Sequence, residues 1–189
     1  MQRLFSLVTF LGAASLAVGQ ATDVTTGALG DAQPVTTNPE VGETWVATFD
    51  SDAVKGTVTA VAAEVGVNYT IDVTGLAEEN GPYKYHIHVS PVPESGSCAD
   101  TGGHLDPYQR RDTPPCESTL PQTCEVGDLS GKYGLLDGGD VEKVFNDAYS
   151  SLNATEVGYI GGRAVVFQDG SGARIACATL VKVEDACEQ

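Results

Sequence analysis

The stretch Tyr69-Thr70-Ile71-Asp72-Val73-Thr74 decides the fold of this chain of 189 residues, because apolar and polar side chains alternate along it. In an extended strand, successive side chains point to opposite faces, so residues two apart share a face. Tyr69, Ile71 and Val73 would therefore line one face, and their polar neighbours would line the other. The alternation predicts a β-strand with one buried face and one face in solvent.

Similar short runs cover much of the chain, and each is rich in Val, Ile, Thr, Tyr or Phe and is bounded by Gly, Pro, Asp or Asn. They span residues 44–49, 54–65, 67–73, 83–89, 163–168 and 174–183. This pattern predicts an all-β domain, either a sandwich or a barrel. Residues 140–152 fit two structures equally well. One is a short helix with Val141, Val144 and Phe145 on one face, and the other is an extended segment.

Residues 90–129 form a long segment that is rich in proline and glycine. A loop of this length inside a compact domain is uncommon and is usually functional. The segment contains His104 and three cysteines, namely Cys98, Cys116 and Cys124. We therefore expect a functional loop that disulfides can hold in place.

The N-terminus has the pattern of a secretory signal peptide. Arg3 is followed by an apolar run at residues 4–18, which is shorter than the roughly 20 residues of a membrane span. We expect a signal peptide at 1–19, a flexible lead-in without apolar periodicity at 20–40, and one β domain at 41–185. No second long apolar segment follows, so no membrane span is expected.

The chain is strongly acidic, with a formal net charge of −16 at pH 7. Such a surface repels nucleic acids and anionic membranes, so neither is an expected partner. All five cysteines follow the expected signal peptide, and in an oxidising compartment we expect disulfides. The odd number leaves one cysteine over, and the sequence leaves the pairing open. Asn68 and Asn153 begin Asn-X-Thr sequons, which secretion would expose to glycosylation.

The three histidines of the chain all lie between residues 86 and 104. In His86-Ile87-His88, a spacing of two along a strand directs both imidazoles to one face. His104 follows Gly102-Gly103, a pair that allows a tight turn to bring a third imidazole near the first two. The cluster suggests copper or zinc. The same His-X-His pattern also arises from two polar residues on the solvent face of a strand.

Five strings follow one another in a characteristic order. They are His86-Ile87-His88, Gly103-His104, Cys124-Glu125-Val126-Gly127-Asp128-Leu129, Gly162-Arg163-Ala164-Val165-Val166-Phe167-Gln168 and Arg174-Ile175-Ala176-Cys177. Their order resembles the copper/zinc superoxide dismutase family, and in detail its secreted fungal copper-only branch. The resemblance covers residues 44–183. It implies an all-β, eight-stranded Greek-key β-barrel, an immunoglobulin-like sandwich with a long disulfide-tethered loop. It also implies a secreted oxidoreductase, extracellular or in the cell wall, that uses copper to convert superoxide to dioxygen and hydrogen peroxide.

The resemblance implies roles for single residues. His86 and His88 match the pair of copper ligands on a strand, and His104 matches the ligand on the loop. Arg174 matches the arginine that guides the anionic substrate, and a guanidinium near a metal would give an anion a local positive target.

The resemblance also implies a disulfide pairing. Cys98 and Cys177 match the bridge that ties the long loop to the barrel. Cys116 and Cys124 are then the natural second pair, and Cys187 is left over.

Zinc is not expected, because bimetallic members of the family need further histidines and this chain has none. Glu125 stands where the family has its last zinc histidine, and Asp128 follows it, as in the copper-only branch. Glu125 would accept the second ring proton of His104 and fix its tautomer. Because only five residues separate Gln168 from Arg174, the family's long electrostatic loop is missing, and the copper site should be open to solvent.

The fourth copper histidine of the family falls at Gln168. Alternation places Ala164, Val166 and Gln168 on the metal face of their strand. Gln168 stays a candidate ligand through its amide oxygen, which binds copper less well than an imidazole. Since Cu(II) favours four nitrogens and Cu(I) tolerates three, the loss weakens Cu(II) binding more than Cu(I) binding.

Two hypotheses follow. The first is a secreted copper-dependent superoxide dismutase with an atypical three-histidine site, and family inheritance favours it. The second is a non-catalytic, dismutase-like extracellular module that binds copper or nothing, and ligand chemistry favours it. A zinc hydrolase with three histidines and a water ranks last, because the sequence shows no matching substrate pocket. The oligomeric state stays open.

Overall fold

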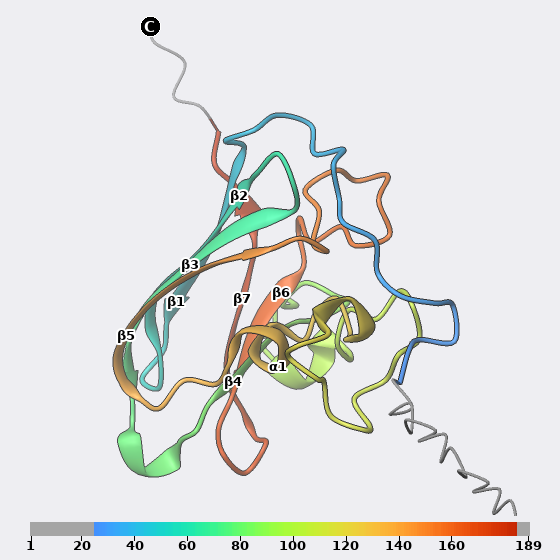
Figure 1. Ribbon diagram of the computed structural model, residues 1–189. Helices are drawn as coiled ribbons and strands as arrows, with labels where there is room; N and C mark the ends of the chain where they lie inside the picture. The colour runs from blue at the N-terminus through green and yellow to red at the C-terminus, as the bar shows by residue number, and fades with distance from the viewer. Residues whose placement is uncertain (1–24, 185–189) are drawn as a thin grey trace, which may run out of the picture.

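The computed structural model describes residues 25–184, which form eight β-strands, one short α-helix and three 3₁₀ helices (Figure 1). The signal peptide expected at 1–19 and Cys187 lie outside the described residues. Among the described residues, no helix is long and apolar enough to cross a membrane.

The strands form two antiparallel sheets. The larger sheet has the order β5-β3-β2-β1-β8, and the smaller has the order β4-β6-β7. The strand bounds are β1 Thr44–Asp50, β2 Lys55–Ala62, β3 Val67–Leu76, β4 Lys84–Ile87, β5 Gly139–Asp147, β6 Ala164–Gln168, β7 Arg174–Thr179 and β8 Val181–Lys182. Eight strands in two packed sheets confirm the all-β expectation, in its sandwich form.

The core lies between the two sheets. Tyr69, Ile71 and Val73 on β3 are buried, as their alternation predicts, while Asp72 on the same strand is exposed. Phe49 of the larger sheet meets Phe167 of the smaller sheet edge to face, with ring centroids 5.1 Å apart. Burying aromatic surface from both sheets is the main force that holds them together.

Two elements differ from the runs in the sequence. Residues 139–147 form β5, which pairs with β3, so the extended alternative for this region is correct. The single run expected at 174–183 is divided between the two sheets. β7 pairs with β6, and β8 pairs with β1, with the buried Leu180 between them.

The described part of the expected lead-in, residues 25–40, is attached to the body of the molecule. Ala32 N–H donates to Gln122 O, Val35 N–H donates to Ala148 O, and the Asn38 side chain donates to Ala63 O. Ala32 and Val35 are buried. A lack of apolar periodicity therefore indicated an irregular segment here, not a loose one.

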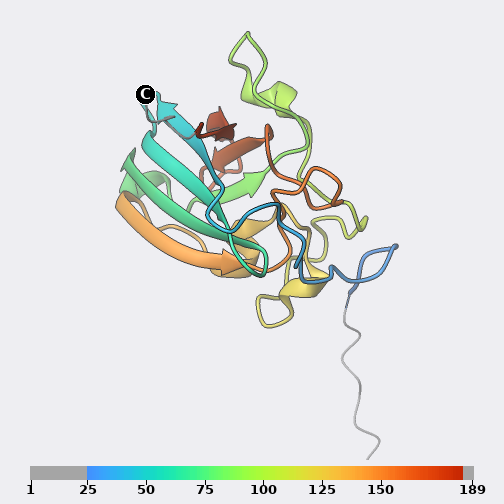
Figure 2. The same cartoon turned by 90° about the horizontal axis from the view of Figure 1, so that it is seen from above.

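The long loop between β4 and β5 carries most of the remaining structure. It contains η2 (Cys98–Thr101), η3 (Pro121–Thr123) and α1 (Leu129–Tyr133), and η1 (Glu78–Asn80) precedes β4. Disulfides join Cys98 to Cys177 and Cys116 to Cys124. In Figure 1 α1 lies beside β4, and Figure 2 shows the larger sheet as a curved layer with the loops on the other side. The loop thus covers the end of the smaller sheet where the histidines lie.

Candidate metal centre

The backbone brings the three histidines together at the end of β4. His86 lies on β4, where it pairs with Val166 of β6, and His88 lies just beyond the strand. His88 forms an isolated antiparallel bridge with His104. Gly102 adopts φ 78°, a left-handed conformation that favours glycine and turns the loop back toward β4. The turn places His104 next to the strand pair, as expected from the two glycines.

One potential ligand nitrogen from each histidine lies within 4.8 Å of the other two. The rings of His86 and His104 stack with centroids 3.9 Å apart, and the centroids of His88 and His104 are 5.3 Å apart. His86 is 3% exposed and His88 is fully buried. The reading of His86 and His88 as polar residues on a solvent face is therefore wrong.

Hydrogen bonds assign the proton on His88. Its Nδ1 lies 2.9 Å from Gly102 O and 3.0 Å from Thr101 Oγ1. Because a carbonyl oxygen can only accept, Nδ1 carries the proton and donates it. The buried Nε2 has no hydrogen-bond partner among the described residues, so its lone pair is free.

His86 has the opposite tautomer. Its Nε2 lies 3.3 Å from Asp128 Oδ1 and 3.2 Å from Ser130 Oγ, so Nε2–H donates to the carboxylate. Its buried Nδ1 has no partner among the described residues. Asp128 also accepts from Gly131 N–H at the start of α1, which fixes the carboxylate in place.

His104 donates from Nδ1 to Glu125 Oε2 at 2.5 Å. Glu125 reaches this position because Gly127 lies close against β4, where a Cβ would stand 2.3 Å from Ile87 O. Ile87 N–H donates to Gly127 O, which holds the segment 124–128 beside the histidine strand. The arrangement is the one expected for Glu125, and it leaves His104 Nε2 as the free nitrogen.

Burial keeps two of the imidazoles neutral. It lowers the pKa of His86 below the ordinary 6.5. For His88, burial and then the positive charge of Arg174 lower the pKa to about 3. Burial raises the pKa of Asp128, but the hydrogen bond and charge of His86 outweigh it, and the net pKa is lowered. At neutral pH a neutral imidazole therefore donates to an ionised carboxylate, which is the state that binds a metal.

A metal ion fits this arrangement. Two buried imidazole nitrogens have no hydrogen-bond partner within residues 25–184, which is costly unless a ligand satisfies them. The second nitrogen of each ring has a partner that fixes its tautomer, as in metal-binding histidines generally. His86, His88 and His104 would hold copper as three neutral imidazoles.

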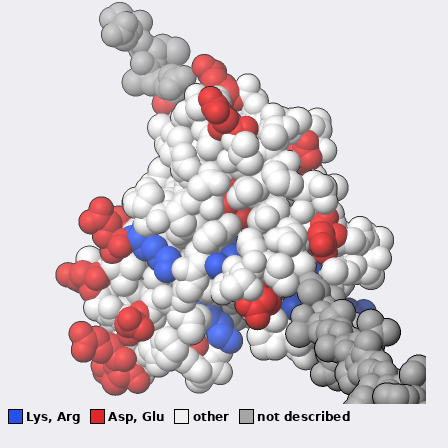
Figure 3. Space-filling view, in the orientation of Figure 1, with Lys and Arg blue, Asp and Glu red and all other residues white. Residues whose placement is uncertain are grey.

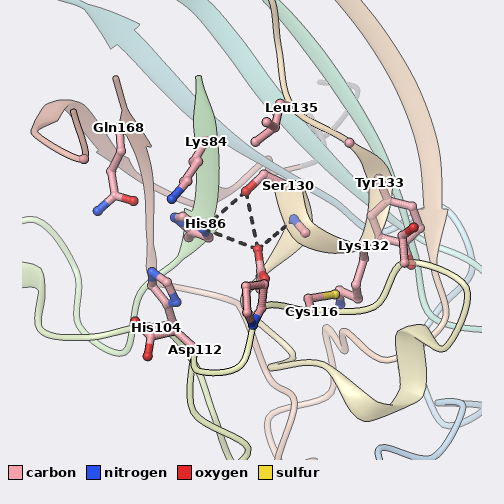
Figure 4. A pocket seen from close by; sticks show the side chains of 16 residues that line it. Lys84, His86, His104, Asp112, Cys116, Ser130, Lys132, Tyr133, Leu135 and Gln168 are labelled. Atoms are coloured by element: carbon pink, nitrogen blue, oxygen red, sulfur yellow. Dashed lines mark hydrogen bonds and ion pairs between the residues drawn. The ribbon is translucent and has the colours of Figure 1, made fainter. Parts of the chain in front are cut away.

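A cavity of about 880 Å³ opens beside His86 and His104. Gln168 and Lys84 also line it, and Figure 4 shows both beside His86. Gln168 is half-buried and lies directly opposite Lys84 in the β4–β6 pairing. The structure therefore places Gln168 beside the histidines, at the mouth of the site. A tight turn over residues 169–173 follows Gln168, and Gly172 of this turn also lines the cavity.

Arg174 lies on the loop side of His88. Its guanidinium donates to Cys98 O at 2.8 Å, to Ala99 O at 3.1 Å and to Gly102 O at 2.8 Å. The side chain thus ties β7 to the loop, and its charge acts on His88.

Sequence reasoning missed three residues of the site. Ser130 and Thr101 hydrogen-bond to His86 and His88, and neither position carries a sequence signal. The position of Lys84 does carry a sequence signal, because Lys84 precedes His86 by two residues and so shares its face of β4.

Two packed antiparallel sheets with a centre of three imidazoles, two of them buried, define a Greek-key β metalloprotein. The chain belongs to the copper/zinc superoxide dismutase family, whose description, "Copper/zinc superoxide dismutase (SODC)", matches residues 54–180.

Two curated relatives and one solved structure are similar to the chain. The "Cell surface Cu-only superoxide dismutase" of Arthroderma benhamiae is 35% identical, over 80% of this chain and 49% of the relative. The "Cell surface Cu-only superoxide dismutase 5" of Candida albicans is 33% identical, over 82% of this chain and 68% of the relative. The Cu(II) structure of Candida albicans superoxide dismutase 5 superposes with a TM-score of 0.71 at 32% identity, covering 79% of this chain and 97% of that one. The chain thus spans about half of the Arthroderma protein.

Proposed function

We propose that this protein is a cell-surface or extracellular copper-dependent superoxide dismutase. It would convert two superoxide anions and two protons to dioxygen and hydrogen peroxide. The convergence of three imidazoles, two of them buried and one half-buried, carries the proposal, because such a site selects a metal that nitrogen ligands bind well. The names of both relatives, which are cell-surface copper-only superoxide dismutases, support copper as the metal, superoxide as the substrate and the cell surface as the location.

Each residue of the site has a defined task in this proposal. Bound copper would supply the one-electron chemistry that oxidises one superoxide and reduces the next. Glu125 and Asp128 hold the protons of His104 Nδ1 and His86 Nε2 away from the centre, so the free nitrogens stay directed at it. Arg174 holds the loop and contributes positive potential near His88, which attracts the anionic substrate.

The expectations for secretion form part of the same proposal. A signal peptide at 1–19, a domain at 41–185, and glycans at Asn68 and Asn153 all agree with a cell-surface location. Asn68 is exposed on β3, on the face directed away from the core. Asn153 is half-buried, and its side-chain amide donates to Thr37 O at 2.7 Å. A glycan on Asn153 would be attached to the half-buried nitrogen that already contacts Thr37 O, so the exposed Asn68 is the better acceptor.

The absence of a fourth imidazole favours a second candidate, a dismutase-like module that binds copper without catalysis. Gln168 is the observation behind it, since an amide is a poorer copper ligand than the histidine that the family places there. Such a site would hold Cu(I) better than Cu(II) and would fail to cycle.

One set of variants separates the two candidates. Copper-loaded protein is assayed for superoxide removal in the presence of a chelator that silences free copper. A dismutase consumes superoxide well above the free-copper background, and His86→Ala abolishes this activity while circular dichroism shows a retained fold. An inactive wild type that gains activity after Gln168→His would establish the non-catalytic module instead.

A further inference from the structure

Lys84 places a positive charge at the mouth of the histidine cavity. It is exposed, lies two residues before His86 on β4, and lines the cavity together with His86 and His104. Among residues 25–184 its ammonium group has no hydrogen-bond or ion-pair partner. In Figure 4 the ammonium lies beside His86, with the amide of Gln168 on the same side of the cavity.

The other cations near the centre already have partners. Lys132 also lines the cavity, but its buried ammonium is bound to Asp147 and to Val126 O. Arg174 donates to carbonyls of the loop. Of the described basic side chains that line the cavity, Lys84 is therefore the one whose charge is left unpaired for an incoming anion.

The carboxylates near the cavity do not compensate Lys84. Asp128 accepts hydrogen bonds from His86 and Gly131. Asp112 also lines the cavity, and Figure 4 shows it beside His104, away from Lys84. The rim of the cavity at β4, where Lys84 lies, is thus positively charged, although the net charge of the protein is −16.

Gln168 faces Lys84 across the β4–β6 pair, and its side-chain amide makes no hydrogen bond to the described residues. Its amide carries two N–H donors, and an anion accepts such hydrogen bonds. An ammonium and an amide at one rim of a cavity form a binding arrangement for a small anion.

We propose that Lys84 and Gln168 form a subsite for a small inorganic monoanion beside the three-histidine centre. Gln168 would then bind the anion through its N–H groups instead of binding the metal through its oxygen. The identity of the natural anion as superoxide rests on the proposed function. Anion binding itself does not rest on the proposed function, because neither Lys84 nor Gln168 needs the metal in order to bind an anion.

The test uses metal-free protein and azide, a small monoanion. The side-chain amide resonance of Gln168, assigned by its absence from the Gln168→Met spectrum, is followed by nuclear magnetic resonance during azide titration. In wild type the resonance should shift saturably. Lys84→Gln should weaken azide binding roughly tenfold, and Lys84→Arg should restore it. Lys55→Gln, which removes an equal charge from an exposed residue that does not line the cavity, should bind azide as the wild type does.

Three outcomes overturn the subsite. They are a Gln168 resonance that does not respond to azide, equal azide affinity in Lys84→Gln and Lys55→Gln, and unchanged affinity in Gln168→Met followed through neighbouring backbone amides. Backbone spectra show whether each variant is folded. If azide binds through Lys84 but the copper-loaded protein does not consume superoxide, the subsite stands and the proposed dismutase function fails. If superoxide is consumed but Lys84 has no effect on azide, the function stands and the subsite fails.

Discussion

At the residue scale, a hydrogen bond at one ring nitrogen of each imidazole fixes the tautomer and leaves the lone pair of the other ring nitrogen available to a metal. His104 Nδ1 donates to Glu125, so its lone pair at Nε2 is held toward the other two rings. Removing such a partner typically costs tenfold to hundredfold in metal affinity. We expect Glu125→Ala to weaken copper binding by about tenfold or more, measured by competition with a chromogenic chelator. Glu142→Ala, at an exposed position on β5, is the control and should bind as the wild type does. Equal affinities for the two variants would show that Glu125 does not position His104.

The buried histidines make metal-free protein sensitive to acid. His88 has a pKa of about 3 when folded, because of burial and the charge of Arg174, against about 6.5 when unfolded. Below pH 6.5 the unfolded chain binds the proton more readily, so stability falls as pH drops from 6.5 toward 3. The lowered pKa of His86 acts in the same direction.

Urea denaturation of metal-free protein at pH 7.5 and pH 5 measures this effect. The midpoint should fall for the wild type and should fall less for His88→Gln, which has no group to protonate at that position. A His88→Gln variant with the same pH dependence as the wild type would mean that other groups control acid sensitivity.

At the element scale, a buried ion pair holds α1 against β5. Lys132 and Asp147 are fully buried and lie 2.9 Å apart, and Tyr133 Oη donates to the same carboxylate at 2.8 Å. Loss of one partner leaves an uncompensated buried charge. We expect Lys132→Met to lower the free energy of unfolding by about 3–5 kcal/mol in urea denaturation. Adding Asp147→Asn, which removes the stranded charge, should recover most of the loss. A double variant as unstable as the single one would contradict this explanation.

The two disulfides constrain loops of very different length. Cys98 and Cys177 are 79 residues apart, and Cys116 and Cys124 are 8 apart. The chain-entropy relation gives about 4.5 kcal/mol for the long loop and about 2.5 kcal/mol for the short one. Serine replacement of both cysteines in each pair should reproduce this order in urea denaturation. Only loss of the first bridge, which holds η2 beside the histidine loop, should also weaken copper binding. If loss of the short-loop bridge lowered the free energy of unfolding more than loss of the long-loop bridge, loop entropy would not determine how much each disulfide stabilises the fold.

The sequence predicted the elements well where the two faces differ clearly, as in β3. It left β5 undecided because Val144 is apolar yet 67% exposed, while Lys143 lies on the inner, half-buried side of the strand. The division of the run 174–183 depends on which sheet each half joins. A change of sheet at Leu180 is a tertiary event that local pattern does not record.

At the scale of the whole molecule, the order of the histidines and cysteines along the chain predicted that the three imidazoles come together, as they do in the structure. The tautomers were only partly predictable. Glu125 could be assigned because the family places a histidine there. The partners of His86 and His88, Ser130 and Thr101, come from a loop whose path the sequence does not determine. The charge of the rim near Lys84 likewise appears only after folding has paired the neighbouring cations.

The net charge of −16 predicts an unusual response to salt. Figure 3 shows acidic side chains spread over the visible face and fewer basic ones. Raising ionic strength from about 0.01 M to about 0.15 M shortens the Debye length from about 30 Å to about 8 Å. That change screens distant carboxylates, which repel superoxide, more than it screens Lys84 at the cavity. The second-order rate constant of copper-loaded protein, measured by pulse radiolysis, should therefore rise over this range. Lys84→Gln should react more slowly at every salt concentration and rise more steeply. A rate that falls throughout would mean that the local cations, and not the net charge, govern the approach of the anion at all distances.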